Sequence, residues 1–245
     1  MSRAHAPWWL WVIRYLVLAL GLFIMGFGIQ LAIASDLGTS PISSLPYVVS
    51  RMTPISVGTL TGCMHVVFIA IQLVLLRREF PPLEFLQLPM AFLMATGIDA
   101  AGAILGPITY SSYTQQWLLC LGGVAVLAVG ICVEVSSGAV VNAGEGVVIA
   151  IYRKTVRRFG VHRWTNFGAI KVYNDAALVV LASALSLAVL GELVGVREGT
   201  LAAAVLTGPA IRLVTPWIGV PLRRLLRLSS PGGERAPASP APASS

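Results

Sequence analysis

The chain has 245 residues, of which 56% are hydrophobic and only 11% are charged, and its mean hydropathy is +0.82. A soluble globular domain usually carries about a quarter charged residues, so this composition excludes that class. The net charge of +7 is compatible with nucleic-acid binding, but the basic residues lie between apolar stretches, as membrane topology requires. Composition therefore predicts a multi-pass membrane protein that contacts the lipid bilayer and binds no nucleic acid.

In chain order, residues 1–13 form an aromatic segment in which Trp8, Trp9 and Trp11 are suited to the headgroup level of a membrane. Apolar stretches of about 20 residues follow, each long enough to cross the hydrocarbon core. The tail 229–245 is rich in proline, alanine and serine, which predicts disorder. The fold class predicted is all-α, a polytopic bundle of six transmembrane helices, at about 15–35, 56–76, 88–106, 116–134, 168–190 and 199–219.

Two shorter segments predict half-helices that do not span the membrane. Ser40 followed by Pro41 is a typical helix start, with a capping side chain and a proline at the first helical position. Asn142 has the same place in the second half, and Glu145 follows three residues later, as in a capping box. The predicted short helices cover about 41–52 and 143–152.

The two halves of the chain align with each other. Residues 20–53 align with 122–155 without a gap, and after an insertion the alignment continues to the sixth span. Each half, 14–110 and 116–222, contains three spans. Because three is odd, the second half enters the membrane from the opposite side, which predicts inverted repeats with any polar site at their interface. Identical residues in the first stretch are Gly21, Gly28, Ile29, Ser35, Arg51 and Thr53, opposite Gly123, Gly130, Ile131, Ser137, Arg153 and Thr155.

Basic residues alternate from one side of the predicted membrane to the other. Arg77 and Arg78 follow the second span and a basic run, 153–163, follows the fourth, whereas 107–115 carries no charge. The positive-inside rule then places both termini in the cytoplasm. Ala32-Ile33-Ala34 looks like a signal-peptide cleavage site, but the preceding apolar run has a counterpart in the second half, so a retained span is expected.

Several motifs resemble a known family. The segment GFGIQLAIASDLGTSPISSLPYVVS (26–50), residues 54–59 and 78–82, and GVREGT (195–200) with Gly208-Pro209 resemble the YczE/YitT-type family, in particular its YczE branch. The resemblance covers about 14–215. It implies an integral bacterial inner-membrane protein, often described as a transporter without a settled substrate, and it supplies no binding residues.

The starts of the two short helices form the candidate substrate-binding site. A helix N-terminus carries unpaired N–H groups and a partial positive charge, which suits an anionic or polar solute. The alternative is that these residues are ordinary interfacial caps that bind no ligand. Acidic side chains beside both starts favour a cation instead, so the sign of the solute stays open. The candidate residues are Asp36, Thr39, Ser40, Ser43, Ser44, Asn142 and Glu145.

Ionisable residues within the spans form a second candidate set. A charge at the bilayer centre costs about 2.5–3.5 kcal/mol on insertion scales, so such residues usually face a partner or water. In the alignment His65 lies opposite Asp175, and Asp99 lies opposite Arg212, which suggests an ion pair across the axis. For Glu134, Asp175 and Arg212, near span ends, a structural role is the favoured interpretation.

No motif of an enzyme, metal site or cofactor is present. Cys63, Cys120 and Cys132 lie in apolar spans without metal-ligand spacing, and His5, His65 and His162 are scattered. We therefore expect no enzyme and no cofactor. The leading hypothesis is a secondary transporter or exporter of a small polar solute, and the alternative is a membrane scaffold or regulator that acts through a partner. Small residues in the first span suit internal packing and a homo-oligomer contact equally well.

Overall fold

The computed structural model describes residues 8–226, and within this range all regular secondary structure is helical, as predicted. Residues 1–7 of the aromatic segment and the tail 229–245 lie outside the described residues. The helices are α1 (Trp8–Ala34), α2 (Pro41–Ser50), α3 (Val57–Leu76), η2 (Arg77–Glu79), η3 (Pro82–Leu86), α4 (Gln87–Leu105), α5 (Tyr113–Ser137), α6 (Ala143–Phe159), α7 (Phe167–Leu190), α8 (Glu198–Val214), η4 (Thr215–Gly219) and α9 (Val220–Leu225).

Six helices of the described chain are long and apolar enough to cross a membrane, which confirms the predicted spans. Their outer faces carry exposed apolar side chains such as Val74, Val205 and Leu213, each 70–72% exposed. Such a surface is suited to lipid and not to water. The sixth span continues to Leu225, beyond its predicted end at 219. Pro216 has no N–H for the helix ladder, and the chain accommodates it in one wider π turn, η4, without ending the helix.

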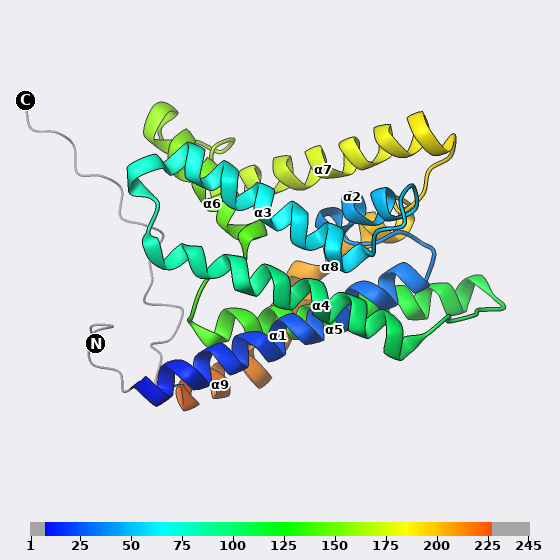
Figure 1. The fold of residues 1–245 in the computed structure, drawn as a ribbon, viewed down its shortest axis with the longest axis horizontal. Helices are drawn as coiled ribbons and strands as arrows, with labels where there is room; N and C mark the ends of the chain where they lie inside the picture. The colour runs from blue at the N-terminus through cyan, green and yellow to red at the C-terminus, as the bar shows by residue number, and fades with distance from the viewer. Residues whose placement is uncertain (1–7, 227–245) are drawn as a thin grey trace, which may run out of the picture.

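Helices α1 and α5 form the most extensive helix pair of the bundle (Figure 1). Gly21 of α1 faces Gly130 of α5, and Gly28 faces Gly123. A Cβ atom on Gly21 would lie 2.6 Å from the backbone nitrogen of Glu134. The two backbones are therefore so close that only glycine fits between them. These four glycines are the ones that coincide when the two halves of the sequence are aligned.

The other helices are arranged around this central pair. Helix α4 packs on α1, and α8 packs on α5. Helix α3 packs on α6 and α2, whereas α7 packs on α2 and α6. One pairing differs between the halves: α3 and α4 pack closely, but α7 and α8 make at most a few contacts within the described residues (Figure 1).

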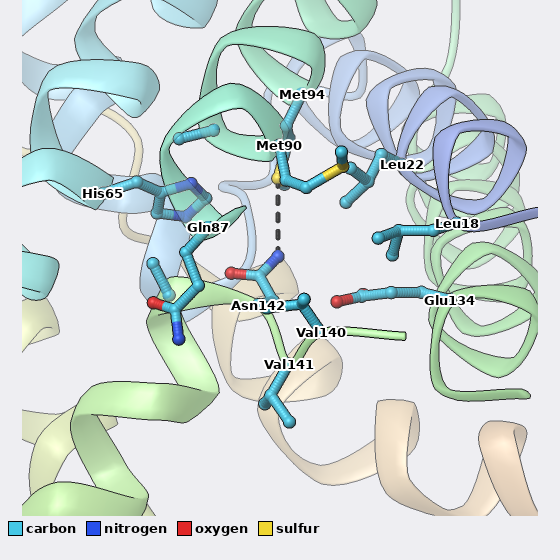
Figure 2. Close-up of a pocket in the computed structure, with 12 residues that line it drawn as sticks. Leu18, Leu22, His65, Gln87, Met90, Met94, Glu134, Val140, Val141 and Asn142 are labelled. Atoms are coloured by element: carbon cyan, nitrogen blue, oxygen red, sulfur yellow. Dashed lines mark hydrogen bonds between the residues drawn. The ribbon is translucent and has the colours of Figure 1, made fainter. Parts of the chain in front are cut away.

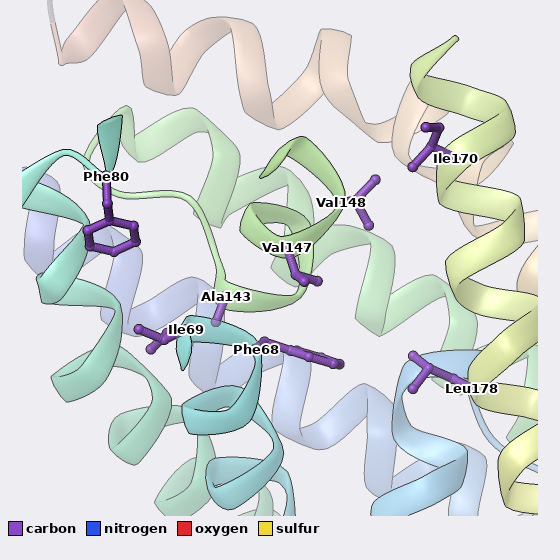
Figure 3. Packing of buried hydrophobic residues seen from close by; sticks show 8 residues of the cluster. All are labelled: Phe68, Ile69, Phe80, Ala143, Val147, Val148, Ile170 and Leu178. Carbon is purple, nitrogen blue, oxygen red and sulfur yellow. The ribbon is translucent and has the colours of Figure 1, made fainter. Parts of the chain in front are cut away.

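Two apolar clusters fill the described part of the bundle. One lies between α1, α4 and α5 and includes Leu18, Leu22, Ile29 and Ile98. The other joins α3 to α6 and α7 (Figure 3). The short helix α6 is therefore held by apolar packing on both sides. The buried members of this second cluster are Phe68, Ile69, Phe80, Ala143, Val147, Val148, Ile170 and Leu178.

Both predicted short helices are present, and their starts approach each other. Ile42 of α2 reaches α6, where a Cβ atom on Gly144 would collide with it. In Figure 1, α6 begins in the central part of the molecule and runs toward the end at which α3 finishes. Asn142 caps α6 as predicted, since its Oδ1 accepts from the Gly144 N–H at 2.9 Å. The predicted cap at Ser40 is wrong, because its hydroxyl donates to Ser43 Oγ at 2.9 Å.

Helix α6 ends at Phe159, seven residues after the predicted Tyr152. Arg157 and Arg158 in its last turn interact favourably with the partial negative charge of a helix C-terminus. Arg157 also pairs with Glu79 of η2, the turn that follows α3, and this hydrogen bond raises the pKa of the guanidinium. Residues 153–158 of the basic run are therefore part of the helix, whereas Arg163 lies beyond its end.

The two ends of the described chain meet at one end of the molecule (Figure 1). Arg14 on α1 donates from Nη2 to the Leu226 carbonyl oxygen at 3.2 Å. Six spans, an even number, bring the end of the chain back to the side on which it began.

Candidate functional site

A narrow internal pocket lies beside the start of α6, between the two halves of the chain (Figure 2). Its empty volume is about 260 Å³, but the space is constricted and holds about one water molecule. Helices α1, α3 and α4 line it from the first half, and α5 and the start of α6 line it from the second. Its polar lining residues are His65, Gln87, Glu134 and Asn142, and the others are Leu18, Leu22, Met90, Ala91, Met94, Val140, Val141 and Ala143.

Glu134 supplies a carboxylate to this pocket. It is only 5% exposed, and Figure 2 shows its side chain directed from α5 toward Asn142. The backbone N–H of Asn142 is its hydrogen-bond donor, and Glu145 lies near enough to repel it. The ion pairs among residues 8–226 all involve other acids, so no basic side chain of that range neutralises Glu134.

His65 and Asn142 face Glu134 across the pocket. His65 is 2% exposed, and its ring makes no hydrogen bond within the described range. The Nδ2 of Asn142 donates to the Met94 sulfur at 3.6 Å, the dashed line of Figure 2. Asn142 therefore connects the start of α6 to α4 while it caps α6.

A pair of buried amides closes one wall of the pocket. Gln72 on α3 donates from Nε2 to Gln87 Oε1 at 3.0 Å and to the Ala143 carbonyl oxygen at 3.3 Å. Gly146 leaves space for this amide, since a Cβ there would lie 2.6 Å from Gln72 Oε1. The start of α6 is thus fixed to the first half of the chain by specific polar contacts.

Apart from Asp36, which is exposed, the predicted residues at the start of α2 are buried, but none of them lines the pocket. The Ser44 hydroxyl donates to the Pro41 carbonyl oxygen at 2.7 Å, which occupies it within the helix itself. Thr39 is fully buried, and its Oγ1 has no hydrogen-bond partner among residues 8–226. Of the residues predicted at the two helix starts, the structure brings only Asn142 into the pocket; those that do not line it are Asp36, Thr39, Ser40, Ser43, Ser44 and Glu145.

The start of α2 instead joins the start of α8. We call this contact between residues 36–39 and 195–200 the α2–α8 junction. The Gly199 N–H donates to the Leu37 carbonyl oxygen at 2.8 Å, and the Thr39 N–H donates to that of Gly195 at 3.2 Å. A Cβ on Gly38 would collide with the Thr200 hydroxyl, and φ at Gly38 is +95°. The DLGTSP and GVREGT motifs therefore meet in a tight contact.

The ionisable residues predicted within the spans are not gathered into one site. Asp99 accepts from Ser56 Oγ at 2.6 Å and from the Gly58 N–H at 2.8 Å, so it caps α3. The predicted pairing with Arg212 is not formed, because Arg212 lies exposed on α8. Asp175 pairs with Lys171, one turn earlier on α7, at 3.7 Å. Of the ionisable residues considered within the spans, His65 and Glu134 line the pocket, whereas Asp99, Asp175 and Arg212 do not.

Sequence reasoning assigned Glu134 a structural role and did not single out the amides of Gln72 and Gln87. Glu134 is the only acidic residue within the fourth apolar span, and that signal was available. Its nearness to a span end favoured snorkelling, but α5 continues to Ser137 and its last turns lie inside the bundle.

Residues 12–216 match the model of a family described as a family of unknown function (DUF6198). The chain is also 29% identical over 118 residues to the uncharacterized protein YyaS of Bacillus subtilis (strain 168). That match covers 48% of this chain and 57% of YyaS, so the chain spans little more than half the length of this relative. No solved structure matches the chain. The likeness to the YczE/YitT-type family stays a prediction. Since the family model covers most of its residues, the chain belongs to this family of unknown function.

Proposed function

We propose that the protein is a secondary transporter that moves a small polar solute by alternating access between two inverted three-helix repeats. The observation that carries the proposal is the pocket between the halves, in which the Glu134 carboxylate is buried without a basic partner among the described residues. An ionisable residue at membrane depth is costly and usually serves a solute or ion pathway.

The packing of α1 on α5 supports the inverted repeat. Under the sequence alignment Gly21 corresponds to Gly123, and Gly130 corresponds to Gly28. Exchanging the two halves therefore turns the contact between Gly21 and Gly130 into the contact between Gly123 and Gly28. Both contacts are present. A pseudo-two-fold axis between antiparallel copies has this property, whereas copies related by translation do not.

The unequal packing of the outer helices supports two alternating states. In this structure α3 packs on α4, but their counterparts α7 and α8 are apart. Two similar repeats in different conformations can exchange those conformations at modest cost. Such an exchange would close α7 on α8, open α3 from α4, and move the access to the pocket from one side to the other.

The charge distribution supports a bacterial inner membrane with both termini in the cytoplasm. The basic residues Arg77, Arg78, Arg157 and Arg158 belong to η2 and to the last turn of α6, at the end of the molecule where the described chain begins and ends (Figure 1). Basic excess at that end satisfies the positive-inside rule.

The test uses purified protein in liposomes and a panel of small polar solutes. The variant is Asn142→Ala, and the matched control is Asn166→Ala. Both asparagines cap a helix, α6 or α7, through the side chain, so each substitution costs about 0.5–2 kcal/mol of stability. Only Asn142 lines the pocket.

We expect uptake of at least one solute by wild type, at least a tenfold slower rate in Asn142→Ala, and a rate near wild type in Asn166→Ala. Equal rates in both variants would show that the pocket is not the transport site. Failure of the wild type to move any solute, in either orientation, would favour a membrane scaffold instead.

A further inference from the structure

We propose that the pocket binds a small alkylammonium cation, with Glu134 as its counter-ion. This inference rests on the proposed transport function and assigns its solute a charge and a chemical class.

The carboxylate sets the sign of the charge. Glu134 is nearly fully buried, and no Lys or Arg side chain among the described residues pairs with it. An ionised carboxylate in an apolar interior is strongly destabilised unless a positive charge or a proton accompanies it. Glu145, close by on α6, adds to the negative potential. No Lys or Arg of the described residues therefore supplies a positive charge to Glu134, and the two carboxylates would repel an anionic solute.

The N-terminus of α6 does not reverse this preference. Helix starts favour anions through their free N–H groups, but here three of the N–H groups near the start of α6 already have acceptors. The Gly144 N–H donates to the Asn142 side chain, and the Gly146 N–H donates to the Asn142 carbonyl oxygen. The Asn142 N–H is directed to Glu134 itself. The Glu134 carboxylate therefore already takes the place that an anion would have at this helix start.

The rest of the lining favours an alkylammonium over an alkali metal ion. A metal ion of this kind needs about six oxygen ligands. The side chains that line the pocket offer four oxygens, two from Glu134 and one each from Gln87 and Asn142, and the two amide oxygens already accept hydrogen bonds from Gln72 and Gly144. Opposite them lie apolar side chains and two methionines, Met90 and Met94. An ammonium group can bond to the carboxylate while its alkyl part contacts these flexible thioethers.

Because the constricted pocket holds about one water molecule, the cation enters only when the halves move apart. When the cation leaves, a proton on Glu134 removes the buried charge. Proton and cation then compete for one carboxylate, which predicts exchange of one for the other. The groups that face or adjoin this carboxylate are His65 from α3 and Glu145 from α6, while Arg223 of α9 donates to the Val135 carbonyl oxygen.

The test measures the unfolding temperature of the purified full-length protein in detergent with added salts. The probes are the chlorides of ethylammonium, tetramethylammonium, sodium and potassium, with sodium propionate and propanol as anionic and neutral counterparts, at matched ionic strength. We expect ethylammonium at about 100 times its Kd to raise the unfolding temperature of the wild type by about 5–10 °C. The shift should shrink as pH falls, because protons compete.

The variants are Glu134→Gln, which keeps the size of the side chain, and Glu134→Asp, which keeps its charge; Asp175→Asn on α7 is the control. The ethylammonium shift should vanish in Glu134→Gln, weaken in Glu134→Asp and persist in Asp175→Asn. A shift that survives in Glu134→Gln, or an equal shift with propionate, propanol or sodium, overturns the inference. If no cation stabilises the protein but liposomes take up another solute, the inference fails and the transport function stands.

Discussion

At the scale of single residues, Asp99 shows that an acid within a span can serve assembly. Its carboxylate accepts from Ser56 Oγ and from the Gly58 N–H and so joins α4 to the start of α3. We expect Asp99→Ala to lower the free energy of unfolding by about 1–3 kcal/mol, because two donors lose a charged acceptor. Thermal unfolding in detergent measures this loss.

The matched control is Asp175→Ala, since Asp175 also lies in a span but, within the described part of the chain, pairs only with Lys171 of its own helix. An exposed pair of this kind contributes at most about 1 kcal/mol, so a smaller loss is expected. Equal losses in both variants would refute the capping role of Asp99. Sequence alone predicted that Asp99 faces the interior, but it named Arg212 as the partner. The alignment places Asp99 and Arg212 at equivalent positions of the two halves, but residues at equivalent positions need not be in contact.

At the scale of helices, the α1–α5 pair depends on glycine at specific positions. A Cβ on Gly123 would lie 2.8 Å from the Ala32 nitrogen, whereas one on Gly122 would have no atom within 4 Å. Gly123→Ala should destabilise the protein by about 1–3 kcal/mol, since the α1 backbone cannot move away. Gly122→Ala should stabilise it by about 0.5–1 kcal/mol through helix propensity. Thermal unfolding should therefore show changes in stability of opposite sign for these two adjacent residues.

The helices themselves were largely predictable, and their ends were less so. Apolar runs of about 20 residues predict membrane spans because the bilayer imposes that length. The cap at Asn142 was predictable from local sequence, yet the equally good cap at Ser40 does not form. The Ser40 hydroxyl forms a hydrogen bond with the Ser43 hydroxyl and does not cap the helix. The local sequence pattern does not decide which of these two bonds forms.

At the scale of the whole molecule, the candidate site was only partly predictable. Sequence reasoning found the start of α6 and His65, because caps and intramembrane histidines are recognisable by type. It gave Glu134 a structural role and did not single out the amide of Gln72; both meet that helix start only through the packing of α3, α4 and α5 around it. No spacing along the chain encodes such a meeting, since its members come from separate helices.

The α2–α8 junction provides a direct test of alternating access. If the protein transports by alternating access, this junction has to open in one of the two states, because it closes the bundle where α2 meets α8. Asp36 and Arg197 lie at its exposed edge, with Arg197 Nη1 donating to the Asp36 carbonyl oxygen at 3.0 Å. Cysteines at both positions, in a chain without Cys63, Cys120 and Cys132, can be joined by a short bifunctional reagent containing a disulfide.

Cross-linking should abolish uptake into liposomes, and a reductant that cleaves the reagent should restore it. The same reagent on cysteines at Ser111 and Gln115 provides the control, because these exposed residues contact each other at the start of α5 and need not separate. Uptake that continues at the full rate with the junction joined would mean that this contact does not open during transport. Access would then have to change at the α3–α4 interface alone, and the two repeats would not exchange conformations.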